Sequence, residues 1–192
     1  MPKLWNETIE LHRREVRDAI LDTTARLAEQ HGLLSVTMSQ IAEETGIGRA
    51  TLYKYFPDVG SILHAWHERQ IDAHLGRLAE VRDRAGGPWE RLEAVLQTYA
   101  ELAQGSHGHA DPDLAAFLHG DGQVVHAEDH LRRMLIDLLK DGVSSGDLRG
   151  DIPPSELATF CLHALVAARI LKSKSAIRRL VAVTLDGLRP PE

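Results

Sequence analysis

The sequence of 192 residues predicts an all-α protein, and three observations support this fold class. Apolar residues recur at helical spacing along most of the chain, and no segment keeps the alternation of a half-buried strand. Glycine and proline separate the periodic stretches. The composition, 43% apolar and 26% charged, is ordinary for a soluble globular protein. We therefore expect about nine helices around a sizeable core.

The first three expected helices are one long and two short. The long helix covers about residues 10–30 and closes at Gly32. Thr37 begins the next helix as an N-cap, and Gln40 three residues later completes the pattern of a capping box. Gly46 stands where a left-handed residue ends that helix. The third helix follows at about residues 48–56.

The two short helices and their glycine turn form a helix-turn-helix pattern, whose second helix can enter the DNA major groove. Leu52 and Phe56 can dock that helix on the first. Arg49 can pair with a guanine edge, and Lys54 can contact phosphate. A surface helical hairpin with ordinary polar residues is the alternative interpretation of the spacing.

Residues 41–57, Ile-Ala-Glu-Glu-Thr-Gly-Ile-Gly-Arg-Ala-Thr-Leu-Tyr-Lys-Tyr-Phe-Pro, resemble the TetR family of bacterial transcriptional regulators. The family pattern combines a threonine cap, Ile-Ala, a small-Gly-Val turn and Thr/Ser-Leu-Tyr before a closing Phe. The resemblance implies phosphate or cap positions at Thr37, Ser39 and Gln40, base-edge positions at Arg49, Ala50 and Thr51, and mixed contacts at Tyr53, Lys54 and Tyr55.

The chain departs from the family pattern at two positions. The family usually has Lys three residues after the closing Phe, where it holds a phosphate, and this chain has Val59. The glycine common in the second short helix is Ala50, which favours the helix. The first departure predicts weaker DNA binding without a change of fold.

Charge and composition limit the possible partners. The net charge is −6, and residues 1–60 contain 7 basic and 9 acidic side chains, so attraction to DNA must be local. Residues 49–57 are basic without an acid, and Arg13, Arg14 and Arg17 add positive charge near the start of the first helix. No signal peptide or membrane span is apparent, so we expect a cytoplasmic protein with Cys161 as a buried thiol.

Six further helical segments follow residue 57. They are expected at about residues 58–83, 88–104, a short stretch containing Phe117, 124–143, 155–171 and 175–188. The break near residue 146 contains Gly-Asp-Leu, as the TetR family typically has there. The last two helices are apolar on most sides, which indicates an interface with a second subunit or a central buried position. The resemblance favours the first alternative, a homodimer.

Histidine is frequent, with 11 residues, and pairs such as His126 and His130 have spacings that could share a metal. No cysteine or carboxylate completes a ligand set, so we predict neither a metal nor a cofactor. The resemblance instead implies an effector site between the later helices, and a largely apolar small molecule fits their side chains. Core packing explains each residue taken singly. The expected lining residues are Trp66, His67, Ile71, His74, Trp89, Leu96, Tyr99, Phe117, His130, Met134, Phe160 and His163.

Together these observations predict a DNA-binding domain at residues 1–56, with its helix-turn-helix at 37–56, and an effector-binding and dimerisation domain at 57–192. The expected function is that of a sequence-specific regulator, by family habit a repressor, released by the effector. No phosphate loop, activated serine or paired carboxylates suggest an enzyme. Two alternatives remain: a helical sensor or carrier of a hydrophobic ligand or metal that does not bind DNA, and an interaction protein whose terminal helices pair with a different chain.

Overall fold

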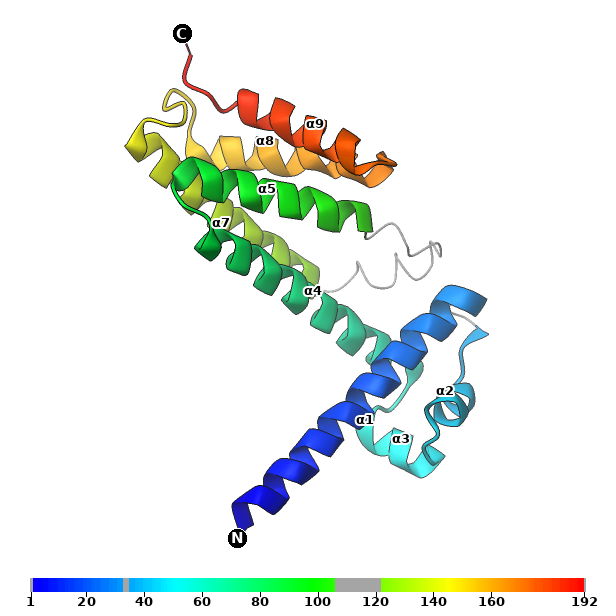
Figure 1. Ribbon diagram of the computed structural model, residues 1–192. Coiled ribbons are helices and arrows are strands. Elements are labelled where there is room, and N and C mark those ends of the chain that lie inside the picture. The colour runs from blue at the N-terminus through cyan, green and yellow to red at the C-terminus, as the bar shows by residue number, and fades with distance from the viewer. Residues whose placement is uncertain (1, 33–34, 106–121, 192) are drawn as a thin grey trace. The chain divides into compact units, whose positions relative to one another are not determined.

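The computed structural model describes residues 2–32, 35–105 and 122–191, and every regular element in these ranges is helical (Figure 1). This confirms the predicted all-α class. Phe117 and the short helix expected around it lie outside the described residues. The elements are α1 (Pro2–His31), α2 (Met38–Thr45), α3 (Arg49–Tyr55), α4 (Val59–Arg84), α5 (Pro88–Gly105), α7 (Gly122–Ser145), α8 (Pro154–Val166), the 3-10 helix η3 (Ala167–Ile170) and α9 (Lys174–Asp186).

Two helices differ from their expected bounds. α1 begins at Pro2, about two turns before the expected start, because proline is compatible with a first helical position and no helix-breaking residue follows it. The helix expected at residues 155–171 is α-helical only to Val166 and continues as the tighter η3. The expected Gly-Asp-Leu turn is present: Gly146 has a φ of 83°, and Leu148 is buried behind it.

The described residues form two compact units, and the division falls within α4, after Gln70. The first unit contains α1, α2, α3 and the start of α4, and its core includes Trp66 and Phe56 as well as aliphatic residues from all four helices: Ile20, Leu21, Ile41, Leu52, Ile62 and Leu63. The expected domain boundary at residues 56/57 remains a prediction from sequence.

The second unit contains the rest of α4 together with α5, α7, α8, η3 and α9. Helix α5 lies in its middle, in contact with α7, α8, η3 and α9 (Figure 1). Fully buried leucines of α5 and α7 lie in its core, namely Leu92, Leu96, Leu135 and Leu139. Each unit thus has its own hydrophobic core.

Candidate nucleic-acid interface

Helix α2 begins and ends as its sequence predicts. Thr37 has an extended backbone and caps the helix: its hydroxyl accepts the Gln40 backbone N–H at 3.3 Å. The Gln40 side-chain oxygen accepts the Thr37 backbone N–H at 2.9 Å, which completes the capping box. At the other end Gly46 has a φ of 70°, which glycine adopts without steric strain. These local contacts set the turn that leads into α3.

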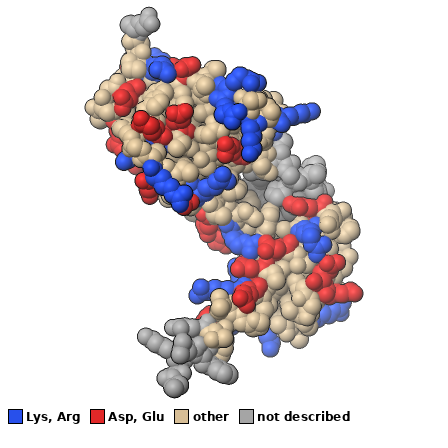
Figure 2. Space-filling model, in the orientation of Figure 1, with Lys and Arg blue, Asp and Glu red and all other residues tan. Residues whose placement is uncertain are grey.

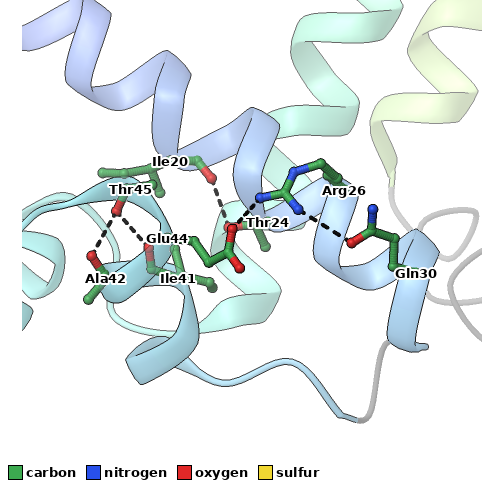
Figure 3. A network of polar contacts seen from close by, with 8 residues as sticks. All are labelled: Ile20, Thr24, Arg26, Gln30, Ile41, Ala42, Glu44 and Thr45. Atoms are coloured by element: carbon green, nitrogen blue, oxygen red, sulfur yellow. Dashed lines mark hydrogen bonds and ion pairs between the residues drawn. The ribbon is translucent and has the colours of Figure 1, made fainter.

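One ion pair links α2 to α1, amid hydrogen bonds within each helix (Figure 3). Arg26 of α1 donates to the Glu44 carboxylate of α2 at 2.6 Å and to the Gln30 side chain at 3.3 Å. Beneath them, the buried Thr24 hydroxyl donates to the Ile20 carbonyl at 2.8 Å, so the polar group is satisfied inside the core. An exposed ion pair contributes at most about 1 kcal/mol.

Helix α3 is anchored by a small buried side. Leu52 is fully buried and Phe56 nearly so, as predicted from their spacing. Tyr55 is partly buried and packs against the same core, so only part of its ring faces solvent. The guanidinium of Arg17 lies 5.5 Å from the centroid of the Phe56 ring, in the range of a cation–π contact. The C-terminal end of α3 is therefore held by α1 as well as by the core.

The remaining surface of α3 is polar and carries no acidic side chain. The exposed residues are Arg49, Ala50, Thr51, Tyr53 and Lys54. Arg49 also donates a hydrogen bond to the hydroxyl of Ser39 on α2, so the two helices present these side chains together. Guanidinium, ammonium and hydroxyl groups donate hydrogen bonds, and phosphate oxygens and acceptor atoms on base edges accept them. Cations and carboxylates are mixed on the visible face in Figure 2, so the basic character of α3 is local.

The position where the resemblance expects a lysine has a packing role in this chain. Val59 begins α4, is partly buried and packs against the first core. The preceding Asp58 accepts the Ser61 backbone N–H at 2.7 Å, which caps the helix in its place. The start of α4 is thus fixed without a cation at position 59.

A second link within the first unit was not predicted from sequence. Arg69 of α4 donates to the Asp18 carboxylate of α1 at 2.8 Å and also to Asp22 one turn further on. Partial burial opposes the charged guanidinium, but the bonds to Asp22 and Asp18 hold the pKa of Arg69 above its ordinary value. The spacing of the two carboxylates places them on one helix face, but no local sequence pattern identifies Arg69, 51 residues from Asp18, as their partner.

The structure distributes the expected effector-lining residues over both units. Trp66 is buried in the first core, and His67 belongs to the same unit. In the second unit, Leu96 and Met134 are together in the core. Four further residues are partly buried, namely Ile71, His74, Trp89 and Tyr99, and three are exposed, namely His130, Phe160 and His163.

Burial changes the ionisation of several of these groups. Burial, and secondarily repulsion from Arg77, lowers the pKa of His74, which favours a neutral imidazole. Burial raises the pKa of Tyr99, so its hydroxyl remains a donor at neutral pH. Burial likewise raises the pKa of Cys161 to about 12, which makes this thiol a packing group and not a nucleophile.

A groove of about 690 Å³ lies between α5 and α9, and of the expected effector residues that the structure describes, Trp89 alone lines it. The guanidinium carbon of Arg189 lies 5.1 Å from the centroid of the Trp89 ring, a cation–π contact. Among the residues that the structure describes, no three potential ligands gather as they would around a metal. Nor is any described helix long and apolar enough for a membrane span.

Comparisons with known proteins agree with this geometry. The family model for bacterial regulatory proteins of the tetR family matches residues 20–65, and the model for the C-terminal domain of SbtR-like transcriptional regulators matches residues 87–190. The transcriptional repressor KstR of Mycolicibacterium smegmatis is 29% identical over 139 residues, which are 70% of this chain and 66% of that protein. The repressor KstR2 of Rhodococcus jostii is 26% identical over 188 residues, 91% of this chain and 92% of KstR2.

Solved structures show the same fold. A TetR/AcrR-family regulator from Thermobifida fusca superposes with a TM-score of 0.71 at 20% identity, covering 90% of this chain and 98% of that one. The matches to the tetR-family model and to the curated repressors favour DNA binding over a helical sensor or carrier that does not use DNA. The helix-turn-helix and the greater part of the second unit both match, so the chain belongs to the TetR family of bacterial regulatory proteins and is a DNA-binding transcriptional regulator, not an enzyme.

Proposed function

We propose that the protein is a homodimeric repressor that places α3 of each subunit in the major groove of a two-fold symmetric operator. The observation that carries this proposal is the exposed, acid-free side of α3, supported from behind by Leu52 and Phe56. In such dimers the two half-sites are about 34–36 Å apart or a multiple of this distance. We call α3 the recognition helix from here on.

The proposed DNA contacts follow the positions of the side chains. Thr37, Ser39 and Gln40 at the start of α2 would contact phosphates and fix the register. On the recognition helix, Arg49, Ala50 and Thr51 would face base edges, and Tyr53, Lys54 and Tyr55 would make mixed contacts with bases and phosphates. The partial burial of Tyr55 supports a contact through its edge or hydroxyl rather than its ring face.

The proposed subunit interface lies on α8, η3 and α9, within residues 155–171 and 175–188. Four large apolar side chains are exposed there: Phe160 at 45%, Val166 at 43%, Ile170 at 77% and Val183 at 69%. Apolar surface gathered on adjacent helices is typical of a protein–protein contact. A second copy of the chain is the partner that the TetR fold favours.

The proposed effector is a small, largely apolar molecule bound in the second unit, in a domain that we place at residues 57–192. Leu96 and Met134 would supply apolar walls, and His74 and Tyr99 would supply polar groups whose neutral forms burial favours. Helix α4 belongs to both units and is therefore the natural element to couple effector binding to the recognition helix. The effector can act only by binding two conformations with different affinity.

Fluorescence anisotropy of the purified protein tests this function. The labelled DNA is the region upstream of the protein's own gene, and sequences selected from a random pool are the second probe. We expect tight, sequence-selective binding with two subunits per site and a palindromic selected sequence. No preference for any sequence at any salt concentration would overturn the repressor proposal.

A further inference from the structure

The N-terminal half of α1 lies outside the core of the first unit. The helix is 30 residues long; among its side chains whose burial is described, from residue 8 onward, the first buried one is Ile20, and every side chain from Thr8 to Glu15 is exposed. The match to the tetR-family model also begins at residue 20. The stretch from Thr8 to Glu15 therefore has no packing role in this core, which begins on α1 with the partly buried Val16, and its surface is available for a partner.

Three arginines of this half lie on the same side of α1 as its buried face. Seven residues make about two helical turns, so residues i and i+7 share a face. The residues seven positions after Arg13, Arg14 and Arg17 are all fully buried, namely Ile20, Leu21 and Thr24. We call the three residues Arg13, Arg14 and Arg17 the arginine stripe. The arginine stripe lies on the same face of α1 as these buried residues, two turns closer to the N-terminus, where that face is exposed and positively charged.

Arg17 connects the arginine stripe to the recognition helix. Its guanidinium stacks over Phe56, the residue at which that helix ends. The stripe therefore starts beside the C-terminal end of the recognition helix and extends from there along α1. A DNA duplex that lies against the recognition helix would have its flanking backbone near this surface.

Two carboxylates of α1 are paired with α4, whereas Glu10 shares the face of the stripe, seven residues before Arg17. Asp18 and Asp22 are directed at α4, where Arg69 binds both carboxylates. In the stripe, Arg13 lies 3.5 Å from Glu10, but both side chains are exposed, and such pairs are weak. Among the side chains that the structure describes, no carboxylate pairs with the other two arginines. The stripe thus retains most of its positive charge.

We propose that the arginine stripe is a second DNA-binding surface, which contacts backbone phosphates that flank the bases read by the recognition helix. The inference rests on the proposed function and deepens it. The guanidinium group binds phosphate through paired N–H donors, and such contacts position a protein without reading sequence. In a chain with a net charge of −6, this cluster supplies attraction that the molecule as a whole does not.

The test compares salt dependence between full-length variants. Arg13→Gln/Arg14→Gln removes two charges from the stripe, and Arg132→Gln/Arg133→Gln removes an adjacent exposed pair from α7 as a matched control. Glu10→Gln is a third variant, which acts in the opposite direction. Anisotropy is measured on the duplex that the wild type selects from a random pool and on an unrelated duplex of equal length.

We expect the stripe variant to weaken binding to both duplexes by similar factors, because phosphate contacts carry no sequence information. Each lost contact makes the slope of log K against log salt shallower by about 0.9, so two contacts reduce the affinity loss between 50 and 200 mM salt by about tenfold. The control should retain the wild-type slope, and Glu10→Gln should bind more tightly than the wild type.

The outcomes separate this inference from the proposed function. Wild-type binding with an unchanged slope in the stripe variant overturns the arginine stripe and leaves the repressor standing. An equal loss in the α7 control also overturns it, because the effect would then be one of net charge. A wild type that binds neither duplex at any salt overturns both proposals.

Discussion

Two exposed surfaces of this protein are made from helices of different length and differ in their apolar content. The recognition helix exposes Arg49, Thr51, Tyr53 and Lys54 and buries little beyond Leu52. Helices α8, η3 and α9 also bury one side, but they expose Phe160, Val166, Ile170 and Val183. The first set can satisfy a charged, hydrated partner, and the second gains free energy only when water is removed from it.

This difference shows that the buried residues of a helix fix its place in the fold, whereas its exposed residues determine which partner it can bind. A seven-residue helix is not stable alone, so the recognition helix depends on the core beneath it. The same holds for η3, whose Ala168 is fully buried. In both regions the core fixes the helix, and residues free of packing constraints determine what can bind.

The largest expected effect comes from removing the buried support of one surface at a time. Leu52→Ala should destabilise the first unit by about 2–5 kcal/mol, because it leaves a cavity under the recognition helix. Leu165→Ala is the matched truncation in the second core, where Leu165 is also fully buried. Hydrogen exchange of backbone amides should increase in α3 for the first variant and in α8 for the second. Identical exchange patterns would show one cooperative unit and break the comparison.

A smaller but still large effect is expected when the apolar surface is charged. Ile170→Glu/Val183→Glu should raise the dimer dissociation constant more than about hundredfold, because each carboxylate would be buried without a partner. Sedimentation velocity would report a monomer at concentrations where the wild type is a dimer. Ile9→Glu/Leu11→Glu charges two exposed apolar residues of α1 and should leave the dimer intact. A dimer that persists in the first variant would place the interface elsewhere.

The polar surface should respond more moderately to a single change. Arg49→Gln should weaken operator binding by about 1–3 kcal/mol, the range for a bidentate contact with a base, and should relax specificity at one position. The selected DNA sequence and its affinity can be measured together by anisotropy. Arg91→Gln removes an exposed arginine of α5 and serves as the control. Affinity and specificity in Arg49→Gln that match those of the wild type would remove the base-reading role of Arg49.

The parts of the molecule that were predictable from sequence are those fixed by neighbours in the chain. The capping box of Thr37 and Gln40 spans three residues, and Gly46 needs only its own backbone conformation, so both were readable and are confirmed. The burial of Leu52 and Phe56 follows from their i, i+4 spacing and is likewise confirmed. Once Leu52 and Phe56 are assigned to the core, the other residues of α3 form its exposed side.

The contacts that the sequence could not predict join distant segments. Arg26 meets Glu44 across 18 residues, and Arg69 meets Asp18 across 51, with no local pattern to pair them. Trp66 was expected among the effector-lining residues, but it lies in the core of the first unit, and the sequence could not say which of the two cores would receive it. The effector-lining set stays a prediction for the same reason.

The smallest expected effect separates two neighbouring tyrosines of the recognition helix. Tyr53 is 55% exposed, whereas Tyr55 packs partly against the core. Tyr53→Phe should keep the fold and weaken DNA binding by about 0.5–1.5 kcal/mol, the contribution of one hydrogen bond from its hydroxyl. Tyr55→Phe is the paired variant, and anisotropy with a melting curve measures both. Unchanged affinity in Tyr53→Phe would remove its phosphate contact, and a loss only in Tyr55→Phe would show that a residue partly committed to the core also reads the partner. Tyr55 would then be a residue that both packs in the core and binds the partner, so the division between buried residues that fix the fold and exposed residues that bind would fail at this position.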